Sequence, residues 1–162
     1  MMHHKALLFK DDHMATQILE AEHPRQVRAL GRKVINFDDK TWNKNRERIV
    51  RQGTLFKFTR PANTEALQQG NCADSPPVET TLRALLLSTG DSELVEASPF
   101  DRIWGVGFKA ETAPAKRERW GLNLLGKILM EARETFRKED EEKENGEEEE
   151  ENEKGVETEE TS

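Results

Sequence analysis

Apolar residues recur at spacings of three and four along most of the first 138 positions, and this period is typical of amphipathic helices. It predicts helices over residues 1–10, 13–22, 24–33, 40–57, 77–88 and 121–138. Asp11 or Asp12 is suited to cap the second helix, and Pro24 is suited to the first turn of the third. Strand-like patterning is short: residues 93–98 suit an extended segment, and residues 99–108 an ordered loop or short strand. The predicted fold class is mainly α, a single multi-helical domain with little β structure.

Charge divides the chain near the end of the last predicted helix. Residues 134–162 hold fifteen acidic and four basic residues, a net charge of −11, whereas the whole chain carries −7. Residues 1–133 therefore carry about +4. From Glu139 the sequence has almost no apolar residues to offset the entropy of an ordered chain. We predict a domain over 1–138 and a disordered acidic tail over 139–162.

Composition also indicates where the protein resides and which ligands it lacks. The one cysteine, Cys72, permits no intrachain disulfide and fits a reducing compartment, and no apolar run approaches the ~18 residues that span a membrane. We expect an intracellular protein, cytoplasmic or nuclear. Its four histidines are not spaced as zinc ligands, so we expect no metal and no cofactor. The proline-punctuated stretch 61–80 is interpreted as a loop.

Two sets of residues in the first half are candidates for chemistry. Lys5 precedes Leu8 and Phe9, so its stem can pack on apolar neighbours while its amine reaches water. The alternative is a partly buried amine of lowered pKa that attacks a sugar aldehyde. Trp42 and Arg46 lie one turn apart on an otherwise apolar helix face. Tryptophan there is typical of a core, whereas the arginine must snorkel, pair with a carboxylate or bind an anion such as phosphate.

The second half holds the other candidates. In "SPFDRIWGVGF", Asp101 is either a turn former or a carboxylate that stabilises positive charge on a sugar ring. Trp104 offers a flat face for a base, and Gly105 permits close approach to a ligand. Asn123 either caps the last helix or binds a ligand.

Taken in order, these segments resemble the NADAR domain family, also called YbiA-like. The resemblance rests on HHKALLF at 3–9, LGR at 30–32, Trp42-x-x-x-Arg46, LFKF at 55–58, LLSTGDSELVEASPFDRIWGVGF at 86–108 and GLNLLGKILMEAR at 121–133. It covers nearly all of residues 1–133. Family members resemble N-glycosidases that cut a base–ribose bond, either in a phosphorylated pyrimidine intermediate of riboflavin biosynthesis or in ADP-ribosylated guanine.

The resemblance implies roles for the candidate residues. Lys5 would capture the sugar C1 as a Schiff base and Asp101 would stabilise charge on the ribose. Trp42 or Trp104 would stack on the base, Arg46 would hold phosphate, and Gly105 and Asn123 would line the ligand site. The expected partner is a small nucleotide or ADP-ribose-type ligand, including one carried on nucleic acid.

The chain departs from the family pattern at two places. The loop at about 61–80 is longer than usual. The family's amino-terminal portion, with a Thr-x-Glu-x-Tyr stretch, is expected just upstream of Lys5, and Met1 and Met2 stand at the positions that follow it. This predicts an amino-terminally truncated member. The alternative function is a catalytically impaired remnant that at most binds ADP-ribose-like ligands, and a third hypothesis is a helical interaction module with a regulatory acidic tail.

Overall fold

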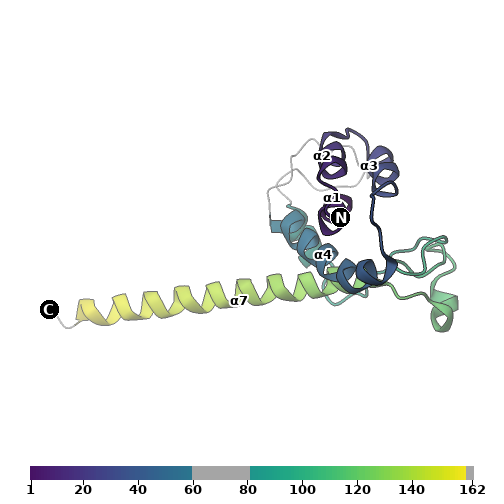
Figure 1. Ribbon diagram of the computed structural model, residues 1–162. Helices are drawn as coiled ribbons and strands as arrows, with labels where there is room; N and C mark the ends of the chain where they lie inside the picture. The colour runs from purple at the N-terminus through teal and green to yellow at the C-terminus, as the bar shows by residue number, and fades with distance from the viewer. Residues whose placement is uncertain (60–80, 160–162) are drawn as a thin grey trace. The chain divides into compact units, whose positions relative to one another are not determined.

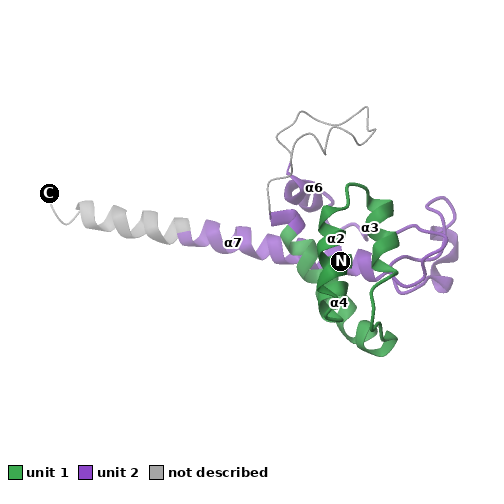
Figure 2. Ribbon diagram, turned by 45° about the horizontal axis from the view of Figure 1, so that its top comes forward, with its two compact units in different colours: residues 1–56 green, residues 57–162 purple. Residues whose placement is uncertain are grey.

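The computed structural model describes residues 1–59 and 81–159, and within those ranges every regular element is a helix (Figure 1). The chain divides into two compact units, Met1–Phe56 and Lys57–Ser162, which Figure 2 colours separately. The mainly helical fold class predicted from the periodicity is confirmed. The loop expected over 61–80, with Cys72, lies outside the described residues.

The first unit gathers its apolar residues between short helices that contact one another. These are α1 (Met2–Leu8), α2 (Asp12–Glu20) and α3 (Pro24–Gly31), followed by the longer α4 (Asp39–Thr59). The buried core consists of Ala6, Phe9, Ala15, Ile18 and Val34. Met2 and Trp42 are partly buried against this core. All four helices begin within two residues of the predicted positions.

Asp11 ties the start of α2 to the segment that follows α3. Its carboxylate is buried, and Oδ1 accepts a hydrogen bond from the backbone N–H of Met14 at 3.0 Å. Oδ2 accepts one from the N–H of Ile35, also at 3.0 Å. Of the two predicted caps, Asp11 is therefore the one used, and it also joins two segments distant in sequence.

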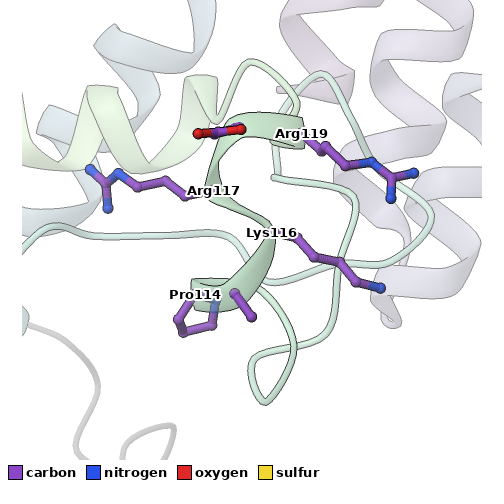
Figure 3. A pocket seen from close by; sticks show the side chains of 6 residues that line it. Pro114, Lys116, Arg117 and Arg119 are labelled. Atoms are coloured by element: carbon purple, nitrogen blue, oxygen red, sulfur yellow. The ribbon is translucent and has the colours of Figure 1, made fainter.

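The second unit contains α6 (Leu82–Ser88), the 3-10 helix η1 (Pro114–Arg119) and α7 (Leu124–Glu159). Helix α6 ends at residue 88 as predicted and begins after its cap Thr81, while the earlier part of the predicted 77–88 helix lies outside the described residues. Gly90 has a positive φ of 55°. Arg83 joins α6 to α7, because its guanidinium donates to both carboxylate oxygens of Asp140 at 2.8 Å and to the carbonyl of Phe136 at 3.0 Å. The 3-10 helix lies between the predicted segments 99–108 and 121–138, and Pro114 stands in its first turn (Figure 3).

Helix α7 extends beyond its predicted end at Lys138, since its backbone stays helical to Glu159 (Figure 1). Phe136 is fully buried, whereas residues 141–146 are all exposed. The acidic stretch from 141 to 146 therefore contributes no buried surface. That the whole segment 139–162 is disordered in solution stays a prediction.

Candidate functional site

Lys5 holds its amine against an aromatic surface inside the first unit. The side chain is half-buried, and Nζ donates a hydrogen bond to the carbonyl of Gly31 at 2.7 Å. Nζ also lies 4.1 Å from the ring centroid of Phe37 and 5.9 Å from that of Trp42. Burial lowers the pKa of the Lys5 amine below its ordinary value, and the nearby Asp39 carboxylate opposes part of that effect. A lysine in such a setting has a larger neutral, nucleophilic fraction.

Close packing of α1 on α3 brings the Gly31 carbonyl to Lys5. A Cβ on Gly31 would lie 2.3 Å from the Sδ of Met2, so a larger residue would displace at least the Met2 side chain from this contact. Phe37 in turn stands edge-on to the buried Phe9, with their centroids 5.2 Å apart. Neither Gly31 nor Phe37 is among the site residues that the sequence predicts. The only signal was the LGR motif, which names Gly31 without saying what its carbonyl does.

Trp42 and Arg46 lie on α4, on the stripe that also carries the buried Ile49 and Val50. Trp42 packs against the core and also lies near Lys5, so it is not purely a core residue. The Nη1 of Arg46 donates to Oδ1 of Asn43 at 2.7 Å. Its Nε is buried and, among the described residues, has no hydrogen-bond partner. That Arg46 holds a phosphate, as the family resemblance implies, stays a prediction.

Asp101 shapes the loop that carries Trp104 in the second unit. Its Oδ1 accepts hydrogen bonds from the backbone N–H groups of Ile103 at 2.9 Å and Trp104 at 2.7 Å. The carboxylate is therefore a turn former, as the structural interpretation of the sequence held. The hydrogen bonds found for this carboxylate among the described residues all go to Oδ1, and the residue is half-buried. Phe100, which the sequence analysis passed over, is 97% exposed beside it.

Backbone hydrogen bonds join the 101–106 loop to the start of α7. The N–H groups of Gly121, Leu122, Asn123, Leu124 and Leu125 donate to the carbonyls of Val106, Arg102, Gly105, Ile103 and Trp104, respectively. A Cβ on Gly105 would lie 2.5 Å from the Glu96 carbonyl oxygen, and one on Gly121 2.2 Å from that of Arg102. Only glycine permits this approach, so Gly105 and Gly121 hold Trp104 in a rigid setting.

Asn123 directly precedes α7, and its backbone carbonyl accepts the first bond of that helix from the N–H of Lys127 at 3.0 Å, whereas its side chain bonds to an earlier segment. It is 5% exposed with a φ of +49°, and its Oδ1 accepts from the N–H of Glu96 at 3.1 Å. Its Nδ2 donates to the carbonyl of Leu94 at 2.9 Å. The side chain thus binds the extended 94–96 segment. The buried Arg133 extends this face by donating to Oγ1 of Thr89 at 2.7 Å and to the Ser92 carbonyl at 2.9 Å.

The structure therefore brings the predicted site residues together in two groups. Lys5 and Trp42 approach each other in the first unit, and Arg46 lies one turn further along α4. Asp101, Trp104, Gly105 and Asn123 form one hydrogen-bonded assembly in the second unit. Within the described ranges, no cluster of three or more histidine, cysteine or acidic side chains is suited to a metal ion. No helix found there is both long and apolar enough to cross a membrane.

The chain is similar in sequence to known proteins over most of its length. The profile of the NADAR domain matches residues 1–137. N-glycosidase R617 of Acanthamoeba polyphaga mimivirus is 39% identical over 136 residues, which are 83% of this chain and 69% of that protein. Protein irg-1 of Caenorhabditis elegans is 33% identical over 150 residues, 90% of this chain and 62% of that protein.

A shorter match concerns a larger protein. The riboflavin biosynthesis protein PYRR, chloroplastic, of Arabidopsis thaliana is 46% identical over 55 residues, 34% of this chain and 8% of that protein. The chain spans about two thirds of the length of N-glycosidase R617 and of Protein irg-1.

Proposed function

Because the chain belongs to the NADAR domain family, we propose that it is an N-glycosidase that hydrolyses the bond between a base and a ribose. The observation that carries the proposal is the half-buried Lys5 amine, bonded to the Gly31 carbonyl and set against Phe37. Relatives named N-glycosidases support the reaction class. The single cysteine and the substrate class fit an intracellular setting.

In the proposed reaction, the neutral Lys5 amine attacks C1 of the ribose. The C1–N bond breaks, and its electron pair leaves with the base, which takes up a proton. The ribosylamine that remains opens to a Schiff base between C1 and Nζ. Water then adds to C1, the C1–Nζ bond breaks, and the free sugar leaves. The net change is addition of one water across the glycosidic bond, and Lys5 returns to its starting state.

Other residues would bind and orient the substrate. Arg46 would bind the phosphate, and Trp42 or Trp104 would stack on the base. The Asp101 carboxylate would stabilise the positive charge that develops on the ribose as the C1–N bond lengthens. Gly105 and Asn123 would line the ligand site beside Trp104, and the bonds of the Asn123 amide to Leu94 and Glu96 would hold that side of the site in position.

We propose two alternative substrates for this reaction. One is a phosphorylated pyrimidine intermediate of riboflavin biosynthesis, which the similarity to a riboflavin biosynthesis protein favours. The other is ADP-ribosylated guanine, which offers the same base–ribose bond beside a diphosphate. Both present a ribose, a base and phosphate, the three features for which Lys5, Trp42 and Arg46 are suited.

The test incubates the full chain with each substrate and measures release of free base by chromatography. Borohydride added during turnover would reduce the Schiff base, and mass spectrometry would locate the sugar on Lys5. Lys5→Met keeps the stem and should abolish base release, whereas Lys33→Met, a matched change of an exposed lysine in the same unit, should leave it unchanged. Undiminished turnover by Lys5→Met would refute the assignment, and no release from either substrate by the unaltered chain would refute the function.

A further inference from the structure

The ring of Phe37 is fixed in place by the chain on either side of it and by the core of the first unit. Asn36 has a positive φ of 53°, which turns the backbone just before Phe37. The Asp38 carboxylate accepts a hydrogen bond from the N–H of Thr41 at 2.7 Å, which fixes the start of α4 just after it. The ring stands edge-on to the buried Phe9 and is 41% exposed. Phe37 is therefore an anchored ring that keeps an accessible surface.

The Lys5 amine lies at cation–π distance from this ring. Nζ is 4.1 Å from the Phe37 centroid, within the ~6 Å over which the face of a ring attracts a cation. The centroid of Trp42, at 5.9 Å, is at the limit of that range. The hydrogen bond of Nζ to the Gly31 carbonyl, 2.7 Å long, keeps the nitrogen in this position. Because the face of an aromatic ring carries partial negative charge, Phe37 stabilises a charged Nζ more than a neutral one.

One carboxylate also acts on the Lys5 amine. It belongs to Asp39, in the first turn of α4, and it raises the pKa of the amine against the larger effect of burial. The titratable residues of the helices packed on α1 are exposed, namely Asp12, His13, Glu20, Arg25 and Arg28. The buried Asp11 is bonded to the N–H groups of Met14 and Ile35, and on α1 itself His3 and His4 stand edge-on to each other. All these groups are unchanged in a Phe37 variant, so such a variant isolates the effect of the ring.

We propose that the face of Phe37 stabilises the positive charge that Nζ carries once it is bonded to the ribose, an inference that rests on the proposed function. As the lone pair of Nζ forms the bond to C1, the bond from C1 to the base breaks and its electron pair leaves with the base. One amine proton passes to the base. The ribose oxygen takes up a proton from water as the sugar ring opens, and Nζ keeps its other proton in a positively charged Schiff base.

The geometry of this intermediate favours Phe37 over the other rings. The N–H of the Schiff base would donate to the Gly31 carbonyl as the amine does, so Nζ keeps its place over Phe37. Because a C–N bond is about 1.45 Å long, C1 would lie within about 5.6 Å of the Phe37 centroid. Both atoms that share the positive charge would therefore lie within cation–π range of the same ring.

Loss of the ring should have two opposing consequences for the rate. It lowers the pKa of the Lys5 amine, so a larger fraction of the amine is neutral, but it also destabilises the charged intermediate, so each neutral amine reacts more slowly. Below the pKa the two effects cancel, whereas above it only the slower reaction remains. A purely structural role of Phe37 would instead lower the rate by the same factor at every pH.

The first measurement is a pH titration of the full chain without substrate, followed by the carbon NMR signal of the Lys5 side chain, which Lys5→Met identifies by its absence. Phe37→Leu should raise the acid dissociation constant of the Lys5 ammonium about fivefold. Phe37→Tyr keeps the ring and should leave the constant unchanged. So should Phe56→Leu, a matched change of a 51% exposed ring in the same unit. An unchanged constant in Phe37→Leu would overturn the proposal.

A trifluorinated phenylalanine at position 37 separates charge from packing. It keeps the shape of the side chain but withdraws electron density from the ring face, so it should change the Lys5 constant in the same direction as Phe37→Leu. If the fluorinated ring behaved as the natural one while Phe37→Leu did not, packing and not the ring face would be responsible, and the proposal would be wrong.

The second measurement is the pH dependence of kcat/KM for base release. Phe37→Leu and the fluorinated ring should lower the plateau at high pH, about fivefold for Phe37→Leu, and leave the rate below the pKa unchanged. An equal loss at every pH would overturn the proposal. Absence of base release from the unaltered chain would refute the proposed function and with it any role of Phe37 in the intermediate. Base release by the unaltered chain, with the same Lys5 titration in Phe37→Leu, would refute this inference alone.

Discussion

Replacing Asn123 by alanine should strongly destabilise the second unit. The change removes the acceptor of the Glu96 N–H and the donor to the Leu94 carbonyl, and both lie in a part of the unit where Asn123 itself is only 5% exposed. Each buried polar group left without a partner costs about 1–3 kcal/mol, so the two together cost about 3 kcal/mol. Alanine must also adopt the positive φ of 49° that asparagine tolerates, which adds about 1 kcal/mol.

A glycine variant separates the two contributions. Asn123→Gly loses the same hydrogen bonds but accepts the positive φ without strain, so it should cost about 3 kcal/mol where alanine costs about 4 kcal/mol. Urea unfolding followed by far-ultraviolet circular dichroism measures both free energies of unfolding. Asn45→Ala serves as control, because Asn45 bonds only within its own helix at the surface and should cost under about 0.5 kcal/mol.

The result that would refute this reasoning is an Asn123→Ala variant within about 0.5 kcal/mol of the unaltered chain. If Asn123→Gly lowered the free energy of unfolding as much as or more than Asn123→Ala, only the strain contribution would be refuted. A stable variant that had lost substrate binding would instead assign Asn123 to the ligand site, as the sequence analysis first proposed.

Two further predictions concern the first unit. Because desolvation lowers the pKa of Lys5, the folded state binds the Lys5 proton more weakly than the unfolded state does, so the free energy of unfolding should rise with pH between the two pKa values. Lys5→Met should remove that rise in urea titrations repeated across pH, and an unchanged profile would contradict the burial argument. Asp11→Ala should cost about 2–3 kcal/mol, because it removes the α2 cap and the partner of the Ile35 N–H. Thermal unfolding by circular dichroism measures the loss, and Asp12→Ala, an exposed change one residue away, should leave the melting temperature unaltered if the reasoning holds.

Helix positions were largely predictable because they depend on local patterns. The stripe of Trp42, Ile49 and Val50 predicts α4, and the structure buries the two aliphatic residues as the period requires. The cap at Asp11 and the end of α6 at Thr89-Gly90 follow from side chains that satisfy helix ends. The end of α7 was not predictable in this way, because the acidic residues that continue it have high helix propensity but no apolar stripe.

The motifs alone could name Lys5, Trp42, Arg46 and Asp101 as candidates, because the residue types and their order carry that information. They could not show that the Lys5 amine donates to the Gly31 carbonyl, since these two residues lie 26 positions apart in the sequence. Nor could they show that the side chain of Asn123 reaches back to Leu94 and Glu96. Spacing along one helix determines which residues share a face. Only the packing of distant segments decides what that face touches, and therefore which side chains remain available for chemistry.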